Sequence, residues 1–233
     1  AHLLTENNLL ALPVVDDQQR LLGIITADDV ADILAQEATE DITRLGASEP
    51  LEEPYLRVSP IILWRKRIVW LFVLFVAQAY TGTVLQFFET ELAEVIALSF
   101  FIPMLIGTGG NAGSQVVMTL VRAMTLGEVR FRDLPRVVSK EFATGLMLGI
   151  TMAVATFIRA LMLDVGVDVG LVVAAAVTAI VVWAAVVGAI LPMVLRQLKV
   201  DPTVVSAPFI STLVDGTGLL IYFTIARMVL RLG

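Results

Sequence analysis

The chain contains no cysteine, and its single histidine, His2, lies at the very start. The lack of cysteine excludes disulfide bonds and thiolate metal sites. Charged residues are also scarce: they make up 16% of the 233 residues, whereas apolar residues make up 58%. Soluble domains are about 25% charged and about 45–50% apolar. The composition therefore indicates a polytopic membrane protein.

The few charges are unevenly distributed along the chain. Within residues 1–56 the only basic side chains are Arg20 and Arg44, whereas the remainder of the chain is slightly basic. The acids of this first segment are Glu6, Asp16, Asp17, Asp28, Asp29, Asp32, Glu37, Glu40, Asp41, Glu49, Glu52 and Glu53. Such a density of carboxylates favours cation binding and argues against nucleic acid. There is neither an initiator Met nor a secretory signal peptide, so we expect a fragment of a longer protein.

The acidic segment reads as a small α/β piece. Residues 12–15 and 21–25 are predicted strands, with a polar turn at residues 16–19 between them. Thr26 is a predicted cap of a helix that runs to about residue 34, with acids in its first turn as the helix dipole favours. Residues 37–45 continue helically, and residues 50–60, which include three prolines, form a linker.

Five apolar windows follow, each near the roughly 20 residues that a helix needs to cross a bilayer. They are residues 63–88, 94–122, 140–163, 170–196 and 204–231. Basic residues precede the first window and occupy the second and fourth connections, whereas the charges of the first and third connections are acids. The positive-inside rule therefore predicts a cytoplasmic N-terminal segment and an outside C-terminus, in a multi-pass protein of the cell (inner) membrane.

Asp215 is the most informative residue of the fifth window, because it lies near the middle of an otherwise apolar stretch. A carboxylate at membrane depth costs several kcal/mol unless it faces a polar cavity or a cation. The neighbouring Ser211, Thr212 and Gly216 add hydroxyls and small residues that let water and backbone approach. We expect Asp215 to hold a hydrated cation; the alternative is a buried Asp paired with an Arg or with a backbone N–H of a neighbouring span.

A glycine-rich run interrupts the second window after Pro103, and two interpretations of it remain open. Each glycine costs a helix interior about 1 kcal/mol, and irregular backbone in a membrane survives only against protein or beside a wet cavity. One interpretation has opened carbonyls, Asn111 and Gln115 facing a hydrated ion. The other is a seam of close helix packing, because Gly109 and Gly113 have the spacing of a small-residue packing motif.

Two further charges lie near the predicted spans. Asp201 precedes Asp215 by fourteen residues, or roughly 21 Å along a helix. Asp201 could mark the mouth of an ion path, but with Pro202 it reads better as a helix start. Arg159, near the end of the third window, could reach the interface or pair with an acid of the next connection, and we assign it no transport role.

Taken together, these motifs resemble a known family. Residues 103–115, PMLIGTGGNAGSQ, and residues 213–222, LVDGTGLLIY, with Asp201-Pro202 and Ser206-Ala207-Pro208 ahead of the latter, look like the membrane domain of the MgtE family of magnesium channels. Residues 12–16 and 23–29, LPVVD and GIITADD, resemble the end of a CBS domain. Residues 37–42, EATEDI, match the start of the family's connecting (plug) helix. The resemblance covers nearly the whole chain.

The resemblance implies a mainly α polytopic membrane protein with five transmembrane helices per subunit, preceded by a partial α/β CBS piece and a connecting helix. The domains would be residues 1–36 (end of a CBS domain), 37–60 (plug helix and linker) and 61–233 (pore domain). It implies a homodimer in the lipid bilayer with its pore on the two-fold axis, where Asp215 of both subunits binds a hydrated Mg²⁺. The pore-lining residues would be Gly109, Gly110, Asn111, Gln115, Ser211, Thr212 and Gly216.

The resemblance also implies that Mg²⁺ is regulatory as well as transported. The gating acids would be Asp29, Asp32, Glu37, Glu40 and Asp41. Without metal, such a cluster on two subunits repels; with metal it can close, and this difference biases the gate. The alternative is an ordinary solvated helix face. No nucleotide site can be traced, because most of the CBS pair lies outside this sequence.

Competing functions of other classes make different demands on the sequence. An ion-coupled exchanger or exporter needs further ionisable relays in the membrane, and beyond Asp215 and Arg159 the chain offers almost none. A membrane-embedded enzyme needs histidine or several carboxylates at one depth, so we expect no enzymatic activity. A non-transporting sensor would keep its cation flux unchanged when Asp215 is replaced by alanine.

Overall fold

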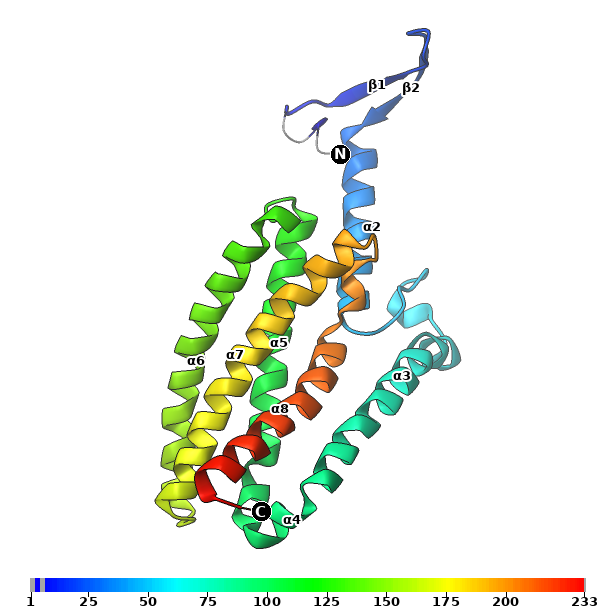
Figure 1. The fold of residues 1–233 in the computed structure, drawn as a ribbon. Coiled ribbons are helices and arrows are strands. Elements are labelled where there is room, and N and C mark those ends of the chain that lie inside the picture. The colour runs from blue at the N-terminus through cyan, green and yellow to red at the C-terminus, as the bar shows by residue number, and fades with distance from the viewer. Residues whose placement is uncertain (1–2, 5–6, 233) are drawn as a thin grey trace.

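The computed structural model describes residues 3–4 and 7–232, so His2 and the extreme ends of the predicted first and last domains lie outside the described residues. A narrow N-terminal part, a hairpin followed by a helix, stands on one end of a bundle of long helices (Figure 1). The bundle contains five helices that are long and apolar enough to cross a membrane. The predicted fold class, a mainly α polytopic membrane protein, is confirmed.

The N-terminal part agrees with the local sequence signals. Strands β1 (Ala11–Val15) and β2 (Leu21–Thr26) pair antiparallel, and helix α2 (Ala27–Leu45) follows without interruption. At the start of α2, Asp29 Oδ2 accepts hydrogen bonds from the hydroxyl and the backbone N–H of Thr26, at 2.6 and 3.0 Å. These bonds, that from the hydroxyl first, hold the pKa of Asp29 below its ordinary value.

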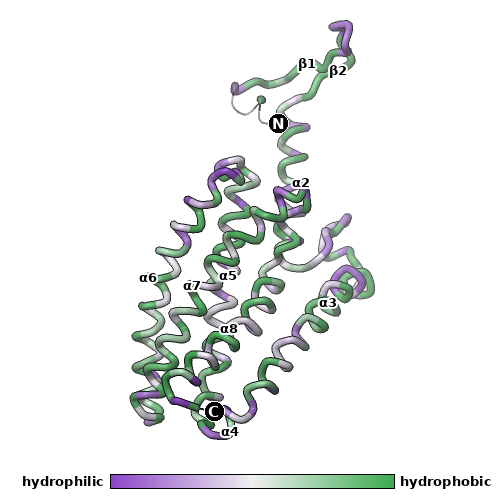
Figure 2. Tube along the Cα trace, in the orientation of Figure 1, coloured by the Kyte–Doolittle hydropathy of each residue, from purple (hydrophilic) through white to green (hydrophobic). Residues whose placement is uncertain are grey.

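The long helices of the bundle are joined by short helical turns. In chain order the helices of this part are α3 (Pro60–Phe87), α4 (Glu89–Glu94), α5 (Ile102–Thr125), α6 (Leu134–Met162), α7 (Val167–Gln197) and α8 (Ala207–Leu230). Helix α7 is central and packs against α5, α6 and α8. Figure 2 shows apolar residues along the helices and hydrophilic residues gathered at their ends. The five predicted spans are therefore confirmed, with boundaries that differ by a few residues.

Helix α3 lies apart from the other spans, and its main partner is α8 (Figure 1). Most of its apolar side chains are not covered by the chain itself; Phe72 and Phe75, for example, are 63% and 74% exposed. In a bilayer such side chains are free to contact lipid tails or another membrane helix. The position of α3 on α8 therefore depends on a small number of contacts.

The end of the bundle opposite α2 is closed by an ion pair between a buried acid and a half-exposed arginine. Glu91 of α4, only 2% exposed, accepts a hydrogen bond from Nε of Arg227 at 2.8 Å and pairs with the same guanidinium through a second nitrogen. This hydrogen bonding keeps the pKa of Glu91 below its ordinary value, although desolvation acts in the opposite direction. The guanidinium lies 5.1 Å from the ring centre of Phe88, so Arg227 also makes a cation–π contact.

Candidate functional site

The centre of the candidate site is Asp215, which lies about two turns inside α8. Ser206 caps this helix by accepting a hydrogen bond from the N–H of Phe209 at 3.3 Å, and Pro208 in the first turn fixes its start. Asp215 is neither fully buried nor fully exposed. Its carboxylate accepts one hydrogen bond, at 3.4 Å, from the amide Nε2 of Gln78 in α3.

Within the described chain, Asp215 has no cationic partner. The ion pairs found there join Arg20 to Asp16, Arg44 to Glu40 and Asp201, and Arg227 to Glu91. The alternative interpretation, in which an arginine or a backbone N–H of another span satisfies Asp215, is therefore not seen among these residues. Gln78 was not predicted from the sequence, although an amide in the middle of an apolar window is a usable signal.

The glycine run does not interrupt the helix of the second span, so the prediction of a broken span was wrong. Helix α5 continues from Ile102 to Thr125 through all of its glycines. Gly109 lies against Ile180 of α7 and Val214 of α8, and Gly113 lies against Ile210 and Ala184. The glycines allow three helices to approach closely, and this packing compensates for the stability that glycine costs a helix interior. The carbonyls of the run are therefore closed into a helix.

The residues predicted to line a pore fall into two groups. Gly109, Gly110 and Gly216 are buried at contacts between helices, where their backbones face neighbouring side chains. Asn111, Gln115, Ser211 and Thr212 keep partly or fully open faces.

Gln115 belongs to a groove that was not predicted from the sequence. The groove, about 220 Å³, lies between α5, α6 and α7, and its polar side chains besides Gln115 are Thr119, Glu141 and Thr144. The structure thus brings Gln115 together with Glu141.

The acids of α2 are spread along one helix and engaged in different ways. Asp29 belongs to the helix cap, Glu40 pairs with Arg44, and Asp41 accepts a hydrogen bond from the hydroxyl of Thr125 at 3.4 Å. Asp32 and Glu37 are exposed. In the part of the chain that the structure describes, no three acids or histidines lie close enough together to hold a metal ion. A complete regulatory site would therefore need ligands from outside a single described chain.

Arg44 connects α2 to the segment that precedes α8. It pairs with both Glu40 and Asp201, and Asp201 Oδ1 accepts hydrogen bonds from the N–H and hydroxyl of Thr203 at 2.9 and 2.6 Å. The helix-start interpretation of Asp201 is thus confirmed, since it caps the turn Pro202–Val204. Burial alone would raise the pKa of Asp201, but the Thr203 hydrogen bonds and the Arg44 guanidinium outweigh it and hold the pKa below its ordinary value.

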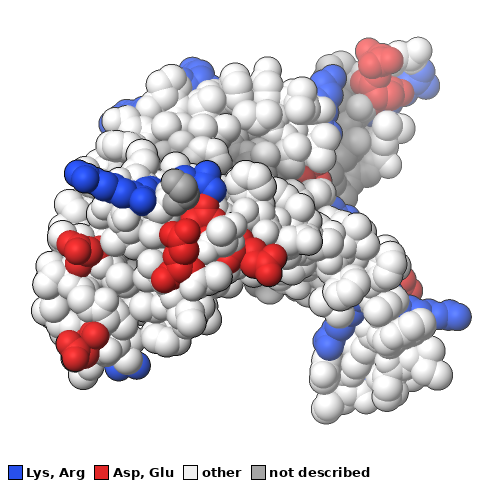
Figure 3. All heavy atoms as spheres, turned by 60° about the horizontal axis from the view of Figure 1, so that its bottom comes forward, with Lys and Arg blue, Asp and Glu red and all other residues white. Residues whose placement is uncertain are grey.

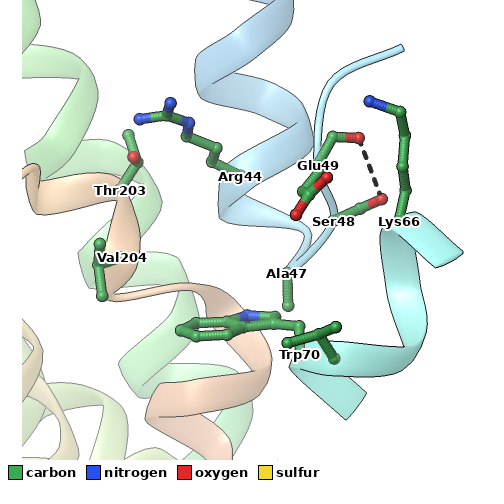
Figure 4. A pocket seen from close by; sticks show the side chains of 9 residues that line it. Arg44, Ala47, Ser48, Glu49, Lys66, Trp70, Thr203 and Val204 are labelled. Carbon is green, nitrogen blue, oxygen red and sulfur yellow. Dashed lines mark hydrogen bonds between the residues drawn. The ribbon is translucent and has the colours of Figure 1, made fainter. Parts of the chain in front are cut away.

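A cavity of about 190 Å³ lies where α2, the linker, α3 and the turn Pro202–Val204 ahead of α8 meet. Figure 4 shows the ring of Trp70 across its floor, Arg44 reaching toward Thr203 on one side and Lys66 on the other. The indole N–H of Trp70 donates to the hydroxyl of Ser206 at 3.3 Å, and Lys66 Nζ donates to the carbonyl of Pro50 at 2.5 Å. The first turns of α3 are therefore fastened both to the linker and to the cap of α8.

The opposite end of the bundle carries exposed acids. Glu89 and Glu94 of α4 are exposed there. Figure 3, which brings this end forward, shows acidic side chains gathered over it with basic side chains beside them. Arg159 is also exposed, and among the described residues it makes no ion pair.

Comparison with known proteins gives two family matches. The MgtE profile, described as a divalent cation transporter, matches residues 102–225, which is more than half of the chain. A CBS domain profile matches residues 1–36. These matches fall on the bundle and on the N-terminal part respectively.

The chain is also similar to three curated proteins, each called magnesium transporter MgtE. It is 43% identical to that of Thermus thermophilus over 99% of this chain and 51% of that protein. It is 33% identical to that of Bacillus subtilis over 97% of this chain and 50% of the relative. The protein of Enterococcus faecalis is likewise 33% identical, over 99% of this chain and 50% of its own length. The chain spans about half the length of these relatives, and with its bundle matched throughout the central spans it belongs to the MgtE family.

Proposed function

We propose that the chain forms the conducting part of a Mg²⁺ channel, in which Asp215 of two copies holds a hydrated Mg²⁺ on a shared two-fold axis. The observation that carries this proposal is a carboxylate about two turns inside a spanning helix, whose one described hydrogen-bond partner is a neutral amide. An unpaired carboxylate at that depth needs water or a cation. The relatives called magnesium transporters support the choice of ion.

The chemistry of Mg²⁺ agrees with a site built this way. Mg²⁺ prefers six oxygens, gives up its waters reluctantly, and is often held through one or two carboxylates with waters retained. Two Asp215 side chains facing each other repel, and a divalent cation between them cancels both charges. An all-oxygen site alone does not reject Mn²⁺ or Ca²⁺, so the width of the constriction must set the selectivity.

The test of this proposal is cation flux into proteoliposomes. We expect Asp215→Asn and Asp215→Ala to abolish or sharply reduce Mg²⁺ uptake while the protein remains folded. Uptake should follow the membrane potential. Unchanged uptake in both variants would refute the role of Asp215 and favour a non-transporting sensor. Uptake that requires a Na⁺ or H⁺ gradient would favour an exchanger.

We further propose that the gate is controlled by residues 37–60, which comprise the second half of α2 and the linker and lie between a CBS piece (1–36) and a pore domain (61–233). Two contacts support this proposal: Asp41 touches Thr125 at the end of α5, and Arg44 joins Glu40 to Asp201 ahead of α8. Mg²⁺ bound at the acids would change the charge beside both contacts. Because no complete site lies within one described chain, the second subunit would have to supply ligands.

Single-channel recording of the reconstituted protein tests the gate. We expect neutralisation of Glu37, Glu40 and Asp41 to raise the open probability at millimolar Mg²⁺ on the α2 side. Equal currents with and without these acids would remove them from the mechanism. The same recording tests orientation, since the positive-inside rule places α2 in the cytoplasm.

A further inference from the structure

Helix α3 reaches the candidate ion site through a narrow contact with α8. At Gly216, the residue after Asp215, an added Cβ would collide with the ring of Tyr80 and lie 3.3 Å from Oγ1 of Thr81. Gly216 is therefore the point where α8 lets α3 come closest. Since Gln78 lies on the same side of α3 as Thr81, three residues away, this approach places its amide against Asp215.

The polar groups of α3 at this level are incompletely satisfied in the described chain. Oγ1 of Thr81 is buried and has no hydrogen-bond partner there. The Gln78 amide makes its one described side-chain hydrogen bond to Asp215, which leaves a second N–H and the carbonyl oxygen without a described partner. An amide left in this condition in hydrocarbon costs several kcal/mol. These groups must therefore be satisfied by water, by a hydrated ion or by groups outside the described chain.

We propose that Gln78 is a positioning residue of the cation site, which extends the proposed function and rests on it. Its N–H fixes the orientation of the Asp215 carboxylate, and its carbonyl oxygen accepts a hydrogen bond from a water that the divalent cation retains. Amide and carboxylate oxygens suit hard cations such as Mg²⁺. Outer ligands of this kind orient the groups that hold the metal. The cation site thus comprises α3 as well as α8.

This role makes a demand that simple packing of α3 does not make. If Gln78 acts through Asp215 and the water shell, its loss weakens cation binding more than it weakens the fold. The side chain is exposed in the described chain, so removing its amide leaves no cavity behind. Gln86, on the same helix, is also exposed and has no described side-chain hydrogen bond to α8, so it is a matched control.

The experiment measures initial uptake against Mg²⁺ concentration in proteoliposomes for Gln78→Leu, Gln78→Glu and the control Gln86→Leu. Loss of one hydrogen bond to a charged group, here a long one, should raise the half-saturating Mg²⁺ concentration about three- to tenfold in Gln78→Leu. The unfolding temperature in detergent should stay at that of Gln86→Leu. Gln78→Glu keeps an oxygen for the water shell but has no N–H to donate to Asp215. Its half-saturating concentration should therefore lie between those of Gln78→Leu and the wild type.

The outcomes separate this inference from the function on which it rests. Equal half-saturation in Gln78→Leu and Gln86→Leu, with Asp215→Asn inactive, would overturn the role of Gln78 and leave the channel standing. A parallel loss of activity and unfolding temperature in both Gln78 variants would assign Gln78 to packing and also overturn the proposal. An active Asp215→Asn would remove the site itself.

Discussion

Replacing Gly109 with alanine tests the closed, tightly packed α5 that the structure shows. A Cβ at this position would lie 2.5 Å from Cγ2 of Ile180 and 2.8 Å from Cγ1 of Val214. Both neighbours are β-branched and stiff at χ1, so neither methyl group can easily turn aside. The added carbon therefore has to push α7 and α8 away from α5.

The expected cost follows from two opposing terms. Overpacking a well-filled core costs about 1–3 kcal/mol, whereas changing a helical glycine to alanine returns about 1 kcal/mol. Gly107 supplies the matched control, because it lies in the same helix and a Cβ there would have no atom within 4 Å. Gly107→Ala receives the propensity gain without the clash. The two variants should therefore differ in stability by about 1–3 kcal/mol, the propensity term having cancelled.

Unfolding in detergent, followed by heat or denaturant, measures this difference. The double variant Gly109→Ala/Ile180→Ala should recover part of the loss, giving a favourable coupling energy, because alanine at 180 removes one of the two clashing methyl groups. Equal stability of Gly109→Ala and Gly107→Ala would refute the packed seam. It would return the interpretation of the run to an opened backbone beside water.

Three other predictions concern the two ends of the bundle. Glu91→Gln should destabilise the protein by about 2 kcal/mol; the loss is limited because the half-exposed Arg227 recovers some hydration when its buried partner is neutralised. The double variant Glu91→Leu/Arg227→Met should regain most of this stability. Equal melting temperatures in all variants would contradict this. Arg44→Gln should separate α2 from the segment before α8, measured as a longer and broader distance between spin labels on α2 and on the α7–α8 connection. Labelling sites are simple to introduce because the chain has no cysteine. The same distance should depend on pH, because the folded pKa of Asp201 lies below its ordinary 3.8. The Arg44–Asp201 ion pair is therefore complete well above pH 3.8 and is lost as the pH falls through and below that value. An unchanged distance on acidification would refute the role of this ion pair.

Local signals predicted the secondary structure of this chain well. The apolar windows have the length that a bilayer demands, and a threonine followed three residues later by an acid marked the start of α2. Both signals lie within short stretches, so their meaning does not depend on what the chain packs against. The continuity of α5 was not predictable in this way. A glycine run is unfavourable to an isolated helix, and what stabilises the helix here is the packing of Ile180 and Val214 from other helices against the glycines.

The contacts of the candidate site were out of reach for the same reason. Gln78 and Asp215 are separated by 137 positions in the sequence, and Glu91 and Arg227 by 136. Asp215 itself was predictable, because a carboxylate in an apolar window is costly wherever the helix packs. Which group would face it was not, since that depends on the level at which α3 crosses α8.

Under the proposed gate, helix α3 would connect the linker after α2 to the cation site, although few contacts hold it in the bundle. Near its start, Trp70 donates to Ser206, the cap of α8, and the backbone carbonyl of Lys66 accepts a hydrogen bond from the N–H of Glu49 in the linker after α2. Farther along, Gln78 reaches Asp215. A displacement of the linker thus acts on both the cap of α8 and the amide beside the carboxylate. Because few other contacts hold α3, such a displacement meets little resistance from the rest of the bundle, which is what a gate operated by α2 requires.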